Sequence, residues 1–239
     1  MLARQVIFPT LNRRLAILRG FVRFLRERND LVDDPLAGVR RAKLPRRVRE
    51  AISARELEQV TAVLLAEPPS WHRTRDATLL LLLYYTGLRL TEVARLDLSQ
   101  VDLAAVVLRA AIRKGGDTTD VVLHPCLAAQ LSVWLRVRGT LDVQALFPRG
   151  NTGRLSTRSI QLRIRRMGQR AGLGVALHPH ALRHAHATGL LRVGVATAII
   201  QQSMNHHALA TTELYLHGDL AMVRAAVEKL PALPVVAPG

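Results

Sequence analysis

The first regular pattern of apolar residues lies near the N-terminus. Between residues 10 and 28, leucines and a valine recur at steps of three and four with arginines between them, which predicts one amphipathic helix. Asn29 and Asp30, followed by Asp-Asp-Pro at 33–35, are typical of a segment that ends a helix. Residues 40–50 then carry a dense run of basic side chains, which predicts a basic linker.

A capping-box pattern marks the start of the main domain. Ser53 supplies a hydroxyl that can cap a helix, and Glu56 stands three residues later, where its carboxylate can bond back to the Ser53 backbone. We therefore expect a partial helical segment at 1–39, the linker at 40–50 and the main domain at 51–230. A flexible tail is expected at 231–239, where the Pro- and Val-rich composition carries no strong structural signal.

Most of the main domain has helical periodicity, with one change of pattern near its middle. Gly87 interrupts a very apolar helical stretch at 77–85. Val106–Leu108 and Val121–Leu123 have β character and flank a glycine-containing turn at Lys114–Asp117, which predicts a hairpin. Further helices are expected at 90–96, 127–137, 156–170, 179–191, 196–204, 211–215 and 222–230. The expected fold class is mainly α with a small antiparallel β-sheet (α+β).

Charge adds an expected class of binding partner to this picture. The chain has 34 Lys and Arg against 18 Asp and Glu, a formal net charge of +16. Such an excess favours a polyanionic partner, most often nucleic acid, although a GC-rich genome also enriches arginine. Aromatic residues make up only 4% of the chain, which disfavours a base-stacking single-strand platform and favours contact with duplex phosphates.

Two sets of basic residues are the candidate DNA contacts. The first lies in the linker and the second in the basic helix at 156–170; without a nucleic acid partner, both would be solvated surface. The linker candidates are Arg40, Arg41, Lys43, Arg46 and Arg47, and the helix candidates are Arg158, Arg163, Arg165 and Arg166.

Other sequence features exclude several classes of protein. Cys126 is the single cysteine, so one chain can form neither a disulfide framework nor a cysteine-based zinc site. Arginines interrupt every apolar run near the N-terminus, and no apolar stretch reaches the ~20 residues of a membrane span. We expect a cytoplasmic protein.

Five places carry candidate chemistry, and each has an ordinary structural alternative when taken alone. Arg89 follows the glycine break and can pair with Glu92 one helical turn later. Lys114 stands in the hairpin turn. His180 and Arg183 share one helix face near a helix start, which is a natural phosphate site. The remaining two are His206 and Tyr215.

The histidines also allow a metal site as an alternative. His178, His180, His184 and His186 have spacings that could present several imidazoles on one helix face. A phosphate site already uses His180, and no cysteine or acidic ligand stands near them in the sequence. The phosphate interpretation is therefore favoured over zinc.

Taken together, these residue types favour covalent attack on a phosphodiester. Metal-dependent phosphoryl transfer needs acidic oxygen ligands, and this set has none to spare once Glu92 pairs with an arginine. A tyrosine can attack the phosphorus, arginines can neutralise the transition state, and a histidine and a lysine can move protons. The bond energy is kept in a phosphotyrosine, so neither ATP nor a metal cofactor is required.

The motifs resemble those of the tyrosine recombinase (phage integrase) family of site-specific DNA recombinases. They occur in family order over residues 53–215. The matching segments are Thr86–Arg89 with Glu92, Arg113–Gly116, His180–His184, Asn205–His206 and Thr211–Tyr215. Met204-Asn205 replaces the usual Leu-Gly, and Asp117 stands where many relatives have a second basic residue.

The resemblance implies a role for each residue. Arg89 and Arg183 would hold the scissile phosphate, and Glu92 would support Arg89. Lys114 would be the general acid and His180 a general base and acid. His206 would bond a phosphate oxygen, and Tyr215 would be the nucleophile that forms a 3′-phosphotyrosyl bond.

The resemblance also implies partners and leaves alternatives. Family members act as tetramers on two DNA duplexes, linked by exchange of C-terminal segments, whereas a monomer without DNA is equally compatible with the sequence. The region before residue 51 is shorter than the family's helical core-binding domain, so a fragment, an internal start site and a minimal form are all open. The alternative functions are a type IB-like topoisomerase and a truncated DNA-binding relative that does not recombine.

Overall fold

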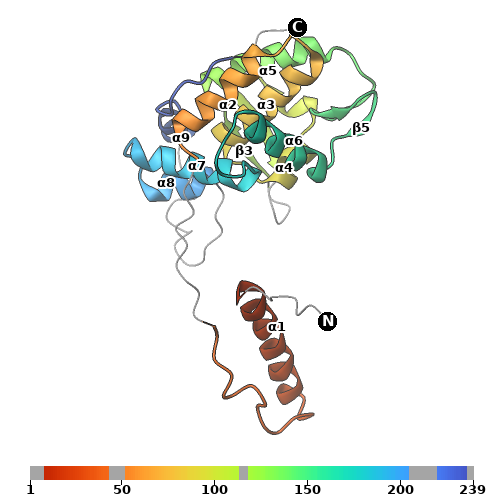
Figure 1. The fold of residues 1–239 in the computed structure, drawn as a ribbon, viewed down its shortest axis with the longest axis vertical. Helices are drawn as coiled ribbons and strands as arrows, with labels where there is room; N and C mark the ends of the chain where they lie inside the picture. Colours follow the sequence, from red (N-terminus) through yellow and green to blue (C-terminus); the bar gives the residue numbers. More distant parts are fainter. Residues whose placement is uncertain (1–7, 43–51, 113–117, 205–219, 236–239) are drawn as a thin grey trace. The chain divides into compact units, whose positions relative to one another are not determined.

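The computed structural model describes residues 8–42, 52–112, 118–204 and 220–235, and the chain divides into two compact units, 1–50 and 51–239 (Figure 1). The first unit contains α1 (Phe8–Glu27), which confirms the helix expected at 10–28. A returning segment runs beside α1, since the Asn12 side chain forms two hydrogen bonds of 2.9 Å with the Ala42 backbone. Arg40 and Arg41 are exposed in this segment.

The second unit confirms the expected fold class of mainly α with small antiparallel sheets. Its helices are α2 (Ala54–Ala66), α3 (Trp71–Thr86), α4 (Leu90–Arg95), a short 3-10 turn η1 (Leu98–Gln100), α5 (Pro125–Arg138), α6 (Thr157–Arg170), α7 (Pro179–Arg192), α8 (Thr197–Ser203) and α9 (Leu220–Val227). Its strands are β1 (Val101–Asp102), β2 (Val107–Ile112), β3 (Thr118–Val122), β4 (Pro148–Arg149) and β5 (Thr152–Arg154). The helix expected at 211–215 lies outside the described residues.

The start of α2 shows the capping box that the sequence predicts. The Ser53 hydroxyl accepts a hydrogen bond from the Glu56 backbone N–H at 3.2 Å. The Glu56 carboxylate in turn accepts from the Ser53 backbone N–H at 2.8 Å, and this bond lowers the pKa of Glu56. Two of the otherwise unpaired donors at the helix start are satisfied in this way.

Helix α3 is the centre of the core. Leu79 to Leu83 are at most 1% exposed, and α2, α5, α6 and α7 pack around the helix (Figure 1). Five consecutive leucines give a helix that is apolar on every side, and such a helix needs neighbours on every side. It ends at Gly87, whose φ of 58° and ψ of 16° belong to the left-handed region that favours glycine at a helix end.

The small sheet is more extensive than the expected hairpin. β2 pairs with β3 in antiparallel register, with Ile112 opposite Thr118, and β1 adds a third strand beside β2. β4 and β5 form a separate two-stranded sheet. Short strands of two or three residues lack the alternating pattern that would predict them. The hairpin tip, residues 113–117, lies outside the described residues.

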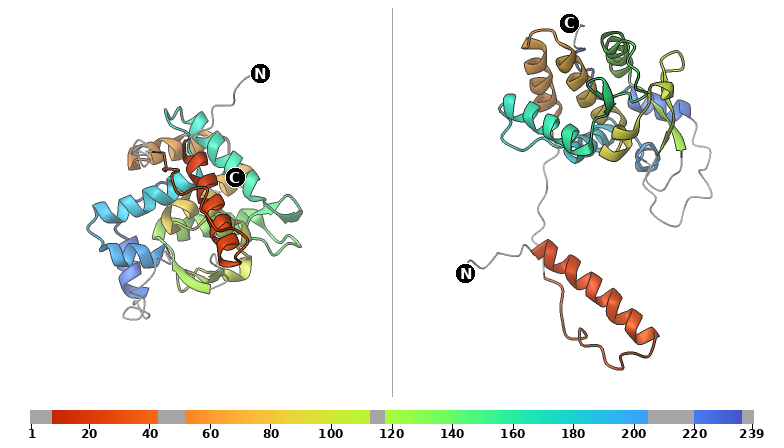
Figure 2. Two further views of the ribbon diagram at one scale, coloured as in Figure 1. Left: turned by 90° about the horizontal axis from the view of Figure 1, so that it is seen from below. Right: turned by 90° about the vertical axis from the view of Figure 1, so that its right-hand side faces the viewer.

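The C-terminal segment packs against the rest of the second unit through a tyrosine and a histidine. The Tyr85 hydroxyl donates to the Pro231 carbonyl at 2.8 Å and accepts from the Leu233 backbone N–H at 2.8 Å. The His124 ring stacks on Tyr85, and its Nε2 lies 3.2 Å from the Leu230 carbonyl. Residues 231–235 have no regular secondary structure, yet Leu233 is only 2% exposed. Helix α9, just before this segment, contacts α8 and β3 (Figure 2).

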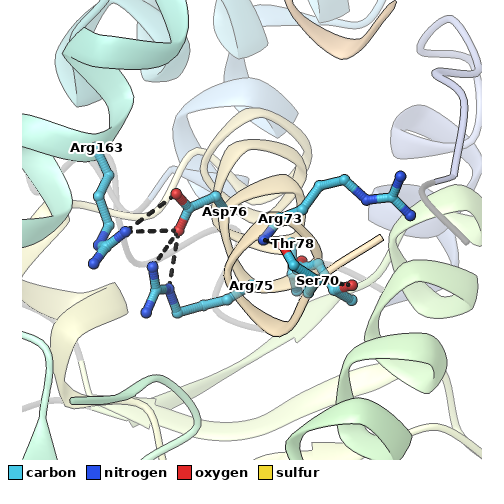
Figure 3. Close-up of polar contacts among 7 residues, drawn as sticks. Ser70, Arg73, Arg75, Asp76, Thr78 and Arg163 are labelled. Carbon is cyan, nitrogen blue, oxygen red and sulfur yellow. Dashed lines mark hydrogen bonds and ion pairs between the residues drawn. The ribbon is translucent and has the colours of Figure 1, made fainter. Parts of the chain in front are cut away.

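A cluster of charges joins α6 to α3. Asp76 lies between two arginines, with Arg75 Nη2 at 2.8 Å and Arg163 Nη1 at 3.2 Å (Figure 3). The Arg75 side chain is 2% exposed, and its guanidinium also lies 4.8 Å from the centre of the Trp71 ring. Burial lowers the pKa of Arg75, and the Asp76 carboxylate opposes that shift. Asp76 therefore compensates a buried charge and fixes the position of α6.

We predict that Asp76→Asn lowers the free energy of unfolding by about 3 kcal/mol, because it leaves the buried Arg75 charge uncompensated. The matched control is Asp97→Asn, since Asp97 pairs with Arg154 where both side chains are more than a third exposed. That control should cost at most about 1 kcal/mol. Guanidinium unfolding of the full chain measures both, and equal losses would contradict the role assigned to Asp76.

Candidate active site

The turn between α3 and α4 positions the first arginine of the site. Leu88 is 1% exposed and anchors the turn in the core, and Arg89 follows at the start of α4. The Glu92 carboxylate accepts from the Arg89 backbone N–H at 2.7 Å and from Arg89 Nη1 at 3.1 Å. The expected pairing of these two residues is confirmed. The buried Glu92 carboxylate therefore caps the start of α4 and orients the Arg89 guanidinium.

The second arginine comes from α7. His178 caps this helix, because its Nδ1 accepts from the Ala181 backbone N–H at 3.1 Å. Arg183 is 6% exposed and donates to two backbone carbonyls, from Nη1 to Gly87 and from Nη2 to Met204 at 2.7 Å. The side chain is therefore fixed from two elements, the α3–α4 turn and the end of α8. The carbonyls satisfy N–H groups without cancelling the positive charge.

Arg89, His180 and Arg183 line a common cavity of about 740 Å³. The other lining residues are Leu88, Leu90, Gln161, His178, Pro179, His184, Ala187, Ile200, Gln201 and Met204. No aspartate or glutamate is among the lining residues that the structure describes. The N-terminus of α7 adds partial positive charge to the cavity. This combination is suited to an anion the size of a phosphate group, held by two arginines.

Three of the six expected catalytic residues can be placed in the structure. Arg89, His180 and Arg183 come together, and Glu92 supports the first of them. Lys114, His206 and Tyr215 lie outside the described residues, as do the linker candidates Lys43, Arg46 and Arg47.

The histidines near this cavity occupy different environments. The rings of His178 and His180 are nearly parallel with centres 6.3 Å apart, and His184 also lines the cavity. His186 is 1% exposed and packs away from the cavity against Gly87. Within 8–42, 52–112, 118–204 and 220–235, no three His, Cys, Asp or Glu side chains are grouped to hold a metal ion.

The arginines of α6 lie on two different sides of the helix. Arg158 and Arg165 are exposed and share a helical face with Gln161, which lines the phosphate cavity. Arg163 and Arg166 instead line a second cavity of about 240 Å³ between α2, α3 and α6, where Arg163 pairs with Asp76. Gln161 and Gln201 were not among the sequence-predicted residues. The sequence does indicate Gln161, because it lies three residues after Arg158 and so shares its helix face.

The comparisons with known proteins identify the family of the chain. Residues 51–221 match the model described as Phage integrase family, which is more than half of the chain. The chain belongs to the phage integrase family. It is 36% identical over 208 residues to "Tyrosine recombinase XerC" of Haemophilus ducreyi, covering 86% of this chain and 67% of that protein. It is 37% identical to the protein of the same name in Alcanivorax borkumensis, covering 88% and 69%.

Solved structures show the same fold. The XerH site-specific recombinase bound to palindromic difH substrate is similar with a TM-score of 0.69 at 22% identity, covering 92% of this chain and 67% of that one. The integrase from mycobacterium phage Brujita is similar with a TM-score of 0.63 at 23% identity, covering 97% and 75%. In the described part of this phage integrase family member, no helix has the length and apolar character to cross a bilayer.

We predict that stability falls as the pH is lowered from about 6.5 to 4, because burial lowers the pKa of His186 to about 4. The unfolded chain takes up a proton near pH 6.5, whereas the folded chain does not until about pH 4, so the contribution present above pH 6.5 is lost between these values. The loss attributable to His186 is at most about 3 kcal/mol.

His186→Phe should flatten this pH dependence in guanidinium unfolding measured from pH 7 to pH 4. Some slope should remain, since burial also lowers the pKa of His124. An unchanged slope in the His186→Phe variant would contradict the assignment.

Proposed function

We propose that this chain is a site-specific DNA recombinase that cleaves and rejoins duplex DNA through a covalent 3′-phosphotyrosyl intermediate. The observation that carries the proposal is the cavity in which Arg89, His180 and Arg183 converge without a carboxylate among its described lining residues. Family membership and the similarity to XerC proteins support the same reaction. Neither ATP nor a metal ion takes part in the proposed chemistry.

The buried guanidinium of Arg183 and the Glu92-oriented guanidinium of Arg89 bind the non-bridging oxygens of the scissile phosphate. His180 serves as general base and acid, with Lys114 as the acid that protonates the leaving 5′-oxygen and His206 as a further donor to the phosphate. Tyr215 attacks phosphorus, and the P–O5′ bond breaks as the O–P bond to tyrosine forms.

The other tyrosines support the assignment of Tyr215. The chain has three tyrosines, and Tyr84 and Tyr85 are at most 2% exposed within α3. Burial raises the pKa of Tyr84 to about 12, and it also raises the pKa of Tyr85. Neither residue lines the phosphate cavity, so neither is placed to act as a nucleophile.

The DNA backbone is proposed to cross the exposed face of α6 beside the cavity. Arg158 and Arg165 lie on the helix face that contains Gln161, so they would contact phosphates next to the one held by Arg89 and Arg183. The exposed arginines at 40 and 41, with Lys43, Arg46 and Arg47, are proposed to contact the backbone elsewhere. Arg163 is assigned to holding α6 through Asp76.

The proposed assembly is a homotetramer on two DNA duplexes, with the chain as a monomer when DNA is absent. The contact of residues 230–233 with Tyr85 and His124 of the same chain fits the monomer. Light scattering with and without a duplex site distinguishes the two states. A cytoplasmic location is also proposed, because the proposed substrate is chromosomal or phage DNA.

We predict that the chain forms a covalent adduct with DNA through Tyr215. Protein incubated with sheared genomic DNA is denatured, the protein-linked fragments are sequenced, and a nicked duplex built on the recovered site then gives the cleavage rate. Tyr215→Phe should abolish the adduct, and the matched control Tyr84→Phe should retain it. A complete absence of adducts with wild-type protein would overturn the proposal and favour a DNA-binding relative that does not recombine.

Plasmid relaxation and the positions of the adducts test the topoisomerase alternative. A type IB-like topoisomerase would relax supercoiled plasmid as a monomer without site preference, and its adducts would map to scattered positions. A recombinase concentrates adducts at one site and joins two duplexes.

We also predict that the two sides of α6 differ in DNA affinity. Arg158→Ala and Arg165→Ala should each weaken duplex binding and reduce the slope of log K against log salt by about 1, because each removes one phosphate contact. Arg166→Ala is the matched control on the other side of the same helix and should leave the slope unchanged. Equal changes in all three variants, measured by fluorescence anisotropy, would contradict the assigned orientation of α6.

A further inference from the structure

Helix α7 also contacts the α3–α4 turn through a residue that the phosphate chemistry does not use. A Cβ atom added to Gly87 would lie 2.7 Å from Cδ2 of His186, 3.3 Å from its Cγ and 3.4 Å from its Nε2. The first distance is shorter than real Cβ contacts, so the imidazole rests directly on the Gly87 backbone. Glycine is required there twice, for this contact and for its φ of 58°.

The contact is placed between the two arginines. His186 lies three residues after Arg183 on α7, so both side chains project from one side of the helix. Gly87 supplies the carbonyl that accepts from Arg183, and Arg89 follows two residues later. The backbone conformation of Gly87 therefore sets both the direction of its carbonyl and the path of the chain into α4.

We propose that His186 is a positioning residue, whose buried ring sets the separation of α7 from the Gly87 turn and thereby holds Arg183 and Arg89 at the spacing that binds one phosphate. The proposal deepens the proposed function. It rests on that function in one respect, namely that the bound phosphate belongs to DNA.

His186 has no direct part in proton transfer. It is absent from the described lining of the phosphate cavity and is 1% exposed. Neither ring nitrogen makes a hydrogen bond of normal geometry within the described residues. The Tyr84 carbonyl on α3 raises its pKa and the Arg183 guanidinium lowers it, but burial dominates, and the ring is neutral at pH 7.

The test uses four variants of the full chain and one matched control. His186→Ala removes the ring, and His186→Phe replaces it with another flat ring. Gly87→Ala introduces the clashing Cβ atom, and the fourth variant combines Gly87→Ala with His186→Ala. Leu190→Ala is the control, because Leu190 is fully buried on the same helix one turn further from Arg183.

The first measurement does not require DNA cleavage. Inorganic phosphate is titrated into ¹⁵N-labelled protein, and the Nε–Hε signal of Arg183 is followed, with its assignment taken from Arg183→Lys. His186→Ala should weaken phosphate binding by about tenfold, since small displacements of binding groups are costly. His186→Phe should restore it, and Leu190→Ala should retain it despite its loss of stability. Wild-type phosphate affinity in His186→Ala would overturn the proposal.

The second measurement is the rate of covalent cleavage of the nicked duplex at saturating protein. His186→Ala should lower the rate about tenfold with unchanged duplex affinity. Gly87→Ala should lower it about 100-fold in wild type but less than about tenfold in the His186→Ala background, because the clash is then absent. Independent effects that simply multiply would overturn the proposal. If wild-type protein cleaves nothing, the proposed function fails, while the phosphate titration still decides the role of His186.

Discussion

The structure of the site depends on how one buried guanidinium is bound. Arg183 donates to the carbonyls of Gly87 and Met204, and these two hydrogen bonds join the end of α3, the middle of α7 and the end of α8. Arg75 is buried to a similar extent, but there the Asp76 carboxylate cancels its charge and the result is a structural pair. The two described acceptors of Arg183 are neutral carbonyls, and Arg183 lines the cavity together with Arg89 and His180. Arg75 therefore belongs to the charge cluster that joins α3 to α6, whereas Arg183 faces the cavity that is proposed to hold a phosphate.

Helix α3 makes this arrangement possible because it is buried on every side. A helix so enclosed has little freedom to shift, and its last turn therefore gives the Gly87 carbonyl and the start of α4 fixed positions. The same helix presents Tyr85 to the C-terminal segment, only two residues before Gly87. The core, the phosphate site and the docking of the C-terminal segment thus meet at one helix end.

The sequence predicted the local features well and the tertiary ones poorly. Three local features were predicted: the Ser53 cap, the Gly87 break and the Arg89–Glu92 pair. Each of them involves residues no more than four positions apart, so short-range chemistry determines it. The arginines of α6 could not be sorted in the same way. Their number predicted a basic helix, but only packing against Asp76 of α3 shows which side Arg163 occupies. The Pro- and Val-rich composition after residue 230 likewise gave no sign that a buried tyrosine hydroxyl, 146 residues earlier in the chain, binds the Pro231 carbonyl.

Two buried polar side chains lie close together at the Gly87 turn of this site. Arg183 is 6% exposed and donates to the Gly87 and Met204 carbonyls, and His186 is buried without a hydrogen bond of normal geometry in the described residues. Burying each of these polar groups costs stability, and neither is needed to build a helical core. Proteins retain such costs where function requires them, so their convergence on one turn identifies the site on physical grounds, independently of the sequence motifs. The core around α3 offsets these costs, because α3 packs against α2, α5, α6 and α7 and ends at the turn that carries the site.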